Sequence, residues 1–370
     1  MKSESWVSLF GVDPRPWLLE GDEPGARWLA LTGLLDLSSD DPRVIAAHDA
    51  VMADPGTQAL LDRLRPWDED IALSGHDKPA FAPNLLSVLG DMGVGPDDDP
   101  RIGRVLAAML EHQDVDGRFQ SCSTWRGREE PTWGALACDA HAIAETLARF
   151  GYADDPRVAR AFERIAADIV NTEQGRAWLC RPDPDVPFRG PGRKGEFCPQ
   201  VTLEALRAFS WLPAERRPGE VVATGRVSLR AWRERGTEKP YMFGHGRNFK
   251  RGKWPVTWYC ALEMVDVIGR YPDLWAGPDA APEDRRALAE VVACLAAYNV
   301  GADGRVTPQS CFKGFEDHSF GQKKRPSALA TAQVAVALRR LEPIIPEVAA
   351  VDVAGLGSSK GGSGTALPPR

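Results

Sequence analysis

The sequence predicts an all-α fold in which helical hairpins wrap into a closed α/α barrel, or toroid. Three observations support this class: a glycine turn recurs along the chain, the segments around each turn have helical periodicity, and strand-like alternation is scarce. One helical hairpin cannot bury its apolar face alone, whereas stacked hairpins bury a continuous core. A length of 370 residues suits such a repeat architecture, because its core grows by adding units.

The recurring turn consists of a glycine followed by an arginine, with a cysteine a few residues further on. Its three copies are Asp116-Gly117-Arg118 with Cys122, Gln174-Gly175-Arg176 with Cys180, and Asp303-Gly304-Arg305 with Cys311. Two of the copies also carry Gln-Ser directly before the cysteine. A spacing of about 60 residues predicts a degenerate fourth turn near Gly236.

Two classes of helix alternate around these turns. The segment 155–169 is amphipathic, with apolar residues at helical spacing on one face and Arg and Asp opposite. The segment 132–151 is more apolar and ends at Gly151, a residue that suits a helix C-terminus. Other apolar segments of this second class are 83–93, 199–212, 255–269 and 326–341. An amphipathic outer helix paired with an apolar inner helix is the expected repeating unit.

The predicted organisation is one domain over residues 1–350. It consists of N-terminal helices in 1–75 and a repeat core in 80–342. Residues 353–370 are rich in Gly, Ser and Pro and are expected to be disordered, because they cannot bury a core. The loop 181–197 is long for a compact domain, and such loops are often functional.

Composition excludes several classes of protein. A net charge of -7 argues against a nucleic-acid-binding surface. No run of about 18 apolar residues predicts a transmembrane segment, and the N-terminus lacks the apolar run of a signal peptide. Seven cysteines without a C-x-x-C pair indicate reduced thiols, so the cytoplasm is the expected compartment.

Proline is expected at the first position of four inner helices, at Pro83, Pro199, Pro255 and Pro326. Basic residues lie upstream of each helix: Lys78; Arg189, Arg193 and Lys194; Arg247, Lys250, Arg251 and Lys253; Lys323, Lys324 and Arg325. In a closed barrel all inner helices start at one end, so helix dipoles and cations would converge there on a phosphate or diphosphate. The alternative is that these are solvated loop charges.

Cys138-Asp139-Ala140-His141 is the strongest candidate for catalysis. It begins an otherwise apolar helix, where a carboxylate beside a cavity suits a general acid or a metal ligand. We therefore assign Asp139 and His141 as candidate catalytic residues. The alternative is that Asp139 complements the helix dipole and Cys138 packs as a small apolar residue.

A metal site is a third hypothesis, with zinc or magnesium as the ion. Its candidate ligands are Cys138, Asp139, Cys180, Glu196 and Cys198. No pair of them has the sequence spacing typical of zinc ligands. Trp133, Trp258 and Tyr259 are the aromatic candidates: they would line a cavity for a hydrocarbon, or simply pack between hairpins.

These residues resemble those of the prenyltransferase and squalene-cyclase repeat superfamily, and especially its uncharacterised bacterial and archaeal members. The resemblance covers roughly residues 80–342. It rests on Cys-Asp-Ala at 138–140, Phe-Arg-Gly-Pro-Gly-Arg-Lys at 188–194 with Cys-Pro at 198–199, Tyr-Met-Phe-Gly at 241–244 with Trp-Tyr at 258–259, and Phe-Gly-Gln-Lys-Lys at 320–324.

The resemblance implies an α/α toroid with a central cavity for an isoprenoid. Asp139 is similar to the catalytic aspartate of class II terpene cyclases, although Ala137 and Ala140 stand where that motif has carboxylates. Arg193 and Lys194 resemble the diphosphate ligands of protein prenyltransferases, followed there by an acidic residue and a cysteine in the zinc site.

The expected function is therefore action on, or binding of, an isoprenoid or similar diphosphate-bearing ligand. Two alternatives remain open. One is a non-catalytic toroid that binds a partner protein or an anionic ligand. The other is a metalloenzyme that uses Cys, Asp and His side chains.

Overall fold

The computed structural model describes residues 4–67, 75, 78–124, 129–180, 195–235, 244–278 and 280–356. Helices dominate these residues, and the strands among them form two small antiparallel sheets. The predicted all-α class is confirmed. None of the helices within these residues is long and apolar enough to cross a membrane.

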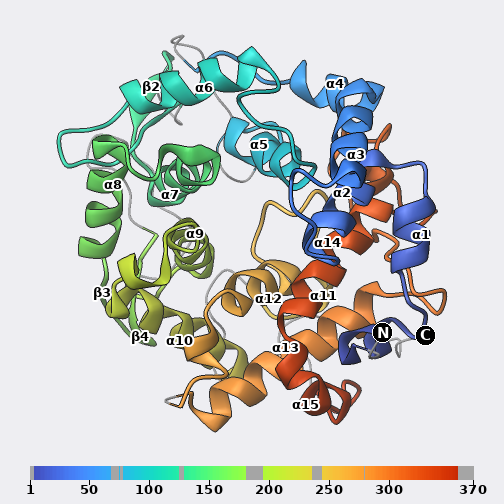
Figure 1. Ribbon diagram of the computed structural model, residues 1–370. Coiled ribbons are helices and arrows are strands. Elements are labelled where there is room, and N and C mark those ends of the chain that lie inside the picture. The colour runs from blue at the N-terminus through green and yellow to red at the C-terminus, as the bar shows by residue number, and fades with distance from the viewer. Residues whose placement is uncertain are drawn as a thin grey trace. The chain divides into compact units, whose positions relative to one another are not determined.

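Fifteen α-helices follow one another along the described chain (Figure 1). They are α1 Arg15–Glu20, α2 Pro24–Gly33, α3 Pro42–Ala53, α4 Pro55–Leu61, α5 Ala82–Asp91, α6 Pro100–Glu111, α7 Ala137–Leu147, α8 Pro156–Ala167, α9 Pro199–Phe209, α10 Gly219–Arg233, α11 Arg247–Arg251, α12 Ala261–Gly269, α13 Pro282–Asn299, α14 Ala328–Arg340 and α15 Ile345–Ala349.

The remaining elements are short. The strands are β1 Ser121–Ser123, paired with β2 Thr132–Gly134, and β3 Val170–Thr172, paired with β4 Gly175–Ala177. The short helices are η1 Ser5–Phe10, η2 Ala148–Tyr152, η3 Ala214–Arg216, η4 Pro272–Leu274, η5 Ser319–Gly321 and η6 Glu342–Ile344. Of these, η2 is a single π-helical turn and the others are 3₁₀-helices.

The chain divides into two compact units. Unit 1 contains residues 1–58, 90–94 and 229–370, and unit 2 contains residues 59–89 and 95–228. Each unit is described by itself below.

In unit 2, burial separates two kinds of helix, as the sequence predicts. Helices α7 and α9 pack against each other (Figure 1) and bury all but one residue each. Helices α6 and α8 bury one apolar stripe and expose the opposite face. Phe162 of α8, for instance, meets Phe209 of α9 edge to face at 4.8 Å.

The predicted glycine turns are confirmed as tight hairpins. Gly117, Gly175 and Gly304 have φ angles of +98°, +135° and +71°, which L side chains rarely adopt. Each turn lies between antiparallel backbone pairs: Gln113 with Phe119, β3 with β4, and Val300 with Val306. The fourth turn, near Gly236, lies outside the described residues.

Four Asp-Pro-Arg triplets start helices in one common way. The aspartate accepts the backbone N–H of the arginine, at 3.0, 2.9, 2.8 and 2.8 Å for Asp13, Asp41, Asp99 and Asp155. The arginine side chain then folds back onto the same carboxylate. These pairs hold the pKa of each aspartate below its ordinary value. A local motif thus sets where these helices begin.

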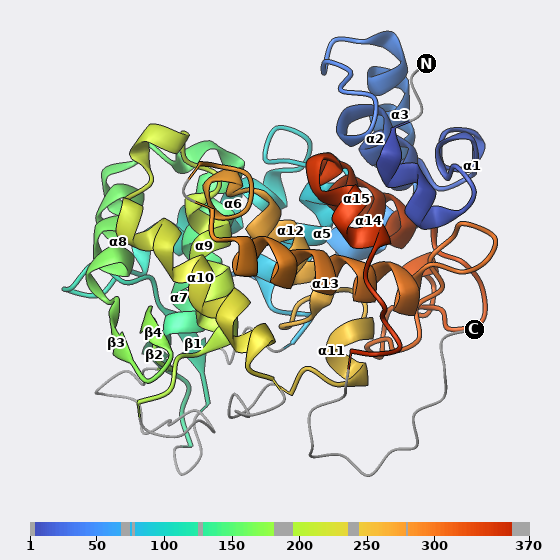
Figure 2. The ribbon, with the colours of Figure 1, turned by 90° about the horizontal axis from the view of Figure 1, so that it is seen from below.

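In unit 1, α2 packs on α3 and α14, and α12 packs on α13 and α14. Helix α15 lies against α13 (Figure 2). The Glu342 carboxylate accepts the backbone N–H groups of Ser5 and Trp6, at 2.6 and 2.9 Å. This ties η1, near the start of the chain, to η6, near its end.

Proline was predicted as the first residue of four inner helices, and it is the first residue of only one of them. Pro199 is the first residue of α9, and Pro83 is the second residue of α5. Helix α12 begins at Ala261, six residues after Pro255. Helix α14 begins at Ala328, because the Ser327 hydroxyl accepts the N–H of Ala330 and caps it.

The predicted helix over 132–151 is also too long at its start. Residues 132–134 form β2, which pairs with β1, and α7 begins only at Ala137. Gly151 does terminate the helix, with a φ of +93°. Residues 353–356 form a turn, and the rest of the predicted tail lies outside the described residues.

Candidate functional site

Asp139 lies in the first turn of α7 and is completely buried. The Ser121 hydroxyl of β1 donates to its Oδ2 at 2.6 Å, and Ser121 is itself fully buried. The β1–β2 hairpin, which follows the Gly117 turn, presents this serine to the start of α7. Ser121 is not among the residues that the sequence predicts for the site. Its signal is the Gln-Ser-Cys triplet that recurs after two of the glycine turns.

His141, two residues further along α7, faces a different neighbour. Its Nδ1 donates to the Val201 carbonyl of α9 at 3.1 Å, and its ring meets Trp178 edge to face at 5.8 Å. Burial lowers the pKa of His141 to about 4, so the ring is neutral near pH 7. Side chains two apart on a helix do not face each other. The structure therefore buries both predicted catalytic residues but gives them separate partners.

Three thiols gather near the start of α7. Cys198 precedes α9, and its N–H donates to the Trp178 carbonyl at 2.7 Å. The Cys180 side chain hydrogen-bonds to the Cys198 thiol. This contact raises the pKa of Cys198, and so do the burial of the thiol and the nearby Cys138. Cys138 and Cys198 are buried, whereas Cys180 is half-buried. None of the seven cysteines is in a disulfide bond.

The predicted metal ligands do not form a recognisable ion site. Glu196 is buried beside Cys198, in the same segment that leads into α9. Among the residues that the structure describes, no group of three or more His, Cys, Asp or Glu side chains is arranged to hold a metal ion. Binding of zinc or magnesium therefore remains a prediction, and the described residues contain no site for either ion.

A second buried polar cluster lies in unit 1, around His245. The Tyr259 hydroxyl and Nε2 of His245 share a hydrogen bond of 2.8 Å. Aromatic rings of Trp232, Phe249 and Tyr259 surround the imidazole. Burial, with the charges of Arg235 and Lys250, lowers the pKa of His245 to about 3. Burial also raises the pKa of Tyr259 above its ordinary value. Tyr259 is one of the residues predicted from the sequence, whereas His245 is not.

Lys250 is the most unusual cation of this cluster. It lies in α11 with only 5% of its surface exposed, and its ammonium is 4.9 Å from the centre of the Tyr298 ring. No described carboxylate forms an ion pair with it. The backbone carbonyl of Lys250 accepts the amide of Asn299, at 2.8 Å, which anchors α11 to the end of α13. A buried cation without a counter-ion suits an anionic ligand.

The other predicted ligand-binding residues are spread over both units. Arg247, Lys253, Lys323 and Lys324 are exposed residues of unit 1, and the Lys253 ammonium lies 3.9 Å from the centre of the Phe312 ring. Trp258, also in unit 1, is half-buried, and Trp133 of unit 2 stacks on His112 at 3.4 Å. Arg189, Arg193 and Lys194 lie outside the described residues.

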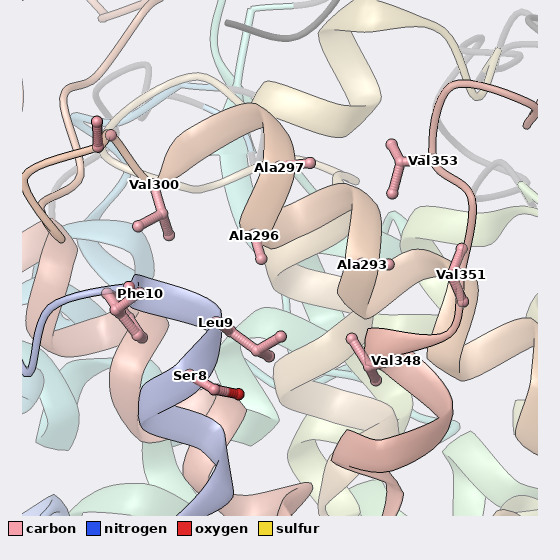
Figure 3. Close-up of a pocket in the computed structure, with 13 residues that line it drawn as sticks. Ser8, Leu9, Phe10, Ala293, Ala296, Ala297, Val300, Val348, Val351 and Val353 are labelled. Carbon is pink, nitrogen blue, oxygen red and sulfur yellow. The ribbon is translucent and has the colours of Figure 1, made fainter.

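Unit 1 also contains an open pocket of about 410 Å³ (Figure 3). Its side chains come from η1, the last turns of α13, α15 and the segment after α15. They include Leu9, Phe10, Ala296, Val300, Val348 and Val351. None of the predicted site residues lines this pocket.

Comparison with known proteins adds no assignment. No protein-family model matches the chain, and no curated protein is significantly similar to it.

Proposed function

We propose that the chain is an enzyme of the prenyltransferase and squalene-cyclase kind that acts on an isoprenoid or similar diphosphate-bearing ligand. In this proposal the hairpins close into an α/α toroid, and Asp139 protonates the hydrocarbon. The observation that carries it is the Asp139 carboxyl group, which is fully buried and held by the Ser121 hydroxyl.

The chemistry follows from this arrangement. Desolvation favours the neutral form of a carboxyl group, which is the form that can protonate a carbon–carbon double bond. Proton transfer from Asp139 would leave a carbocation on the ligand and a carboxylate on the protein. The Ser121 hydroxyl, already 2.6 Å from Oδ2, would stabilise that carboxylate as its charge develops.

Lys250, in unit 1, supports a separate part of the proposal, the binding of an anionic ligand by that unit. Its buried ammonium has a ring contact with Tyr298 and no ion pair with a described carboxylate. Exposed cations lie on either side of Lys250 in the sequence, at Arg247 and Lys253. A phosphate or diphosphate would supply a counter-charge for Lys250, with which no described carboxylate forms an ion pair.

Solvent deuterium tests the role of Asp139. Purified protein is incubated in D₂O with squalene, farnesyl diphosphate or geranylgeranyl diphosphate, and the products are analysed by mass spectrometry. We expect a cyclised product that carries one deuterium, no product with Asp139→Asn, and slower turnover by about 10- to 100-fold with Ser121→Ala.

Asp154→Asn is the matched control for this experiment. Asp154 is an exposed carboxylate of the same unit, paired with Arg216, so its removal should leave turnover unchanged. Turnover by Asp139→Asn at the wild-type rate would contradict the acid role. So would a product without deuterium.

Ligand-induced stabilisation tests the role of Lys250 separately. A ligand at a hundred times its dissociation constant stabilises a protein by about 2.7 kcal/mol. We expect farnesyl diphosphate to raise the unfolding midpoint of the wild type and of Asp139→Asn, but not of Lys250→Met. Without ligand, Lys250→Met should be at least as stable as the wild type, because it removes a buried charge that no described carboxylate pairs with. Equal midpoint shifts in Lys250→Met and the wild type would exclude Lys250 as the anion ligand.

A non-catalytic binder of an anionic ligand is the second candidate, and Lys250 favours it. It predicts the same stabilisation by farnesyl diphosphate but no deuterated product. The two experiments together therefore separate the candidates.

A further inference from the structure

We propose that Cys180 and Cys198 form a reversible dithiol–disulfide pair, and that this pair is a redox modification site of unit 2. The inference does not depend on the proposed isoprenoid chemistry. It rests on the placement of three cysteines that the sequence separates by up to 60 positions, at 138, 180 and 198.

The backbone brings the two segments together. The N–H of Cys198 donates to the carbonyl of Trp178 at 2.7 Å, so Cys180 follows two residues after this junction. Trp178 is fixed in turn, because its indole N–H donates to the Ile165 carbonyl at 2.8 Å and its ring is fully buried. The Cys180 side chain then reaches the Cys198 thiol and hydrogen-bonds to it. A disulfide bond needs Cα atoms about 4.4–6.8 Å apart, and the hydrogen bond between Cys198 and Trp178 brings the two segments together.

Accessibility distinguishes the roles of the two thiols. Cys198 is 3% exposed, whereas Cys180 is half-buried and therefore open to a small reagent. Cys138 is the third thiol of the group and is 5% exposed. Its influence on Cys198 is electrostatic, and no hydrogen bond between these two thiols accompanies it. We therefore assign the bond to Cys180 and Cys198.

The oxidation is a thiol–disulfide exchange with a low-molecular-weight disulfide such as oxidised glutathione. The Cys180 thiolate attacks one sulfur of the reagent, which forms a mixed disulfide and releases one glutathione thiolate. Cys198 then loses its proton and attacks the Cys180 sulfur, which releases the second glutathione. Two protein thiols are oxidised to one disulfide, one reagent disulfide is reduced to two thiols, and the two protons pass to the released glutathione.

The bond would form beside the start of α7, because Cys138, which is near Cys198, directly precedes Asp139 in that helix. Helix α9 begins directly after Cys198. Oxidation would therefore link the segment before the loop 181–197 to the first turn of α9. Reduction by dithiothreitol would reverse it.

Peptide mapping tests the proposal on the full-length chain. The protein is reduced, freed of reductant, incubated with oxidised glutathione, blocked with N-ethylmaleimide, and digested without reduction. We expect a peptide pair linked through Cys180 and Cys198, loss of two of the seven thiols, and full recovery after dithiothreitol. The same treatment in 6 M urea should scatter the bonds among other pairs, because the native geometry is lost.

Variants identify the order of the two steps. Cys198→Ser should stop at a mixed disulfide, with one glutathione on Cys180, and Cys180→Ser should keep Cys198 reduced. Cys294→Ser is the matched control, because Cys294 is fully buried in unit 1, and it should give the wild-type linkage. A native linkage through Cys138, or a wild-type protein that keeps glutathione on Cys180 while Cys198 stays reduced, would overturn the proposal. The wild-type map decides this even if Cys198→Ser fails to fold.

Discussion

His141→Asn should flatten the dependence of stability on pH in the acid range. The Asn amide can replace Nδ1 as the donor to the Val201 carbonyl, which the histidine contacts at 3.1 Å. It cannot bind a proton, however. The substitution therefore removes the titration and keeps the hydrogen bond.

The magnitude follows from the two pKa values of the histidine. Burial lowers the pKa of His141 from its ordinary 6.5 to about 4 in the folded chain. Because the unfolded chain takes up the proton more readily, the stabilising effect is complete above pH 6.5 and is lost as the pH falls towards 4. At about 1.4 kcal/mol per pH unit, the wild type should lose about 3 kcal/mol more than His141→Asn between pH 7 and pH 4.

Urea unfolding, followed by circular dichroism at several pH values between 7 and 4, measures this difference. The m-values of the two proteins must agree at each pH for the comparison to hold. Ile143→Val is the control: Ile143 is fully buried in α7, and its truncation should cost about 1 kcal/mol at every pH. Parallel pH profiles for the wild type and His141→Asn would refute the claim that folding keeps His141 neutral.

Two further predictions concern backbone strain and the second polar cluster. Gly304→Ala should destabilise the chain by about 1–2 kcal/mol in urea unfolding, because φ is +71° there and a Cβ would lie 2.7 Å from the Val12 carbonyl. Its control, Gly103→Ala in the middle of α6, meets no atom within 4 Å and should stabilise by about 0.5–1 kcal/mol; equal effects would contradict the strain argument. Tyr259→Phe should cost about 1–3 kcal/mol, because it leaves Nε2 of the buried His245 without its partner, and no loss of stability would show that this hydrogen bond is dispensable.

Helices and turns were predictable because their signals are local. The Gly117, Gly175 and Gly304 turns need left-handed backbone, which glycine adopts at no steric cost, so a repeated glycine marked each hairpin correctly. The apolar stripe of α8 likewise reveals through its periodicity which face is buried, and the many apolar residues of α7 indicate an inner helix.

Helix starts were less predictable where a second local signal or a tertiary contact competes with a helix-starting proline. Pro255 and Pro326 satisfy the rule for a first helical position, yet α12 and α14 begin later. At α14 the Ser327 cap decides the start. Residues 132–134 are apolar enough to extend α7, but pairing with β1 draws them into a strand.

For Asp139 and Lys250 too, the sequence determines some features and the tertiary structure decides the others. The sequence by itself determined that Asp139 begins a buried helix and that cations cluster before residue 255, because residue type and periodicity carry that information. Only the tertiary structure decided that Ser121 holds Asp139, that Val201 holds His141, and that Lys250 is buried with no ion pair to a described carboxylate. These are contacts, or missing contacts, between segments far apart in the chain, and the free energy of a buried polar group depends on which partner the fold brings to it.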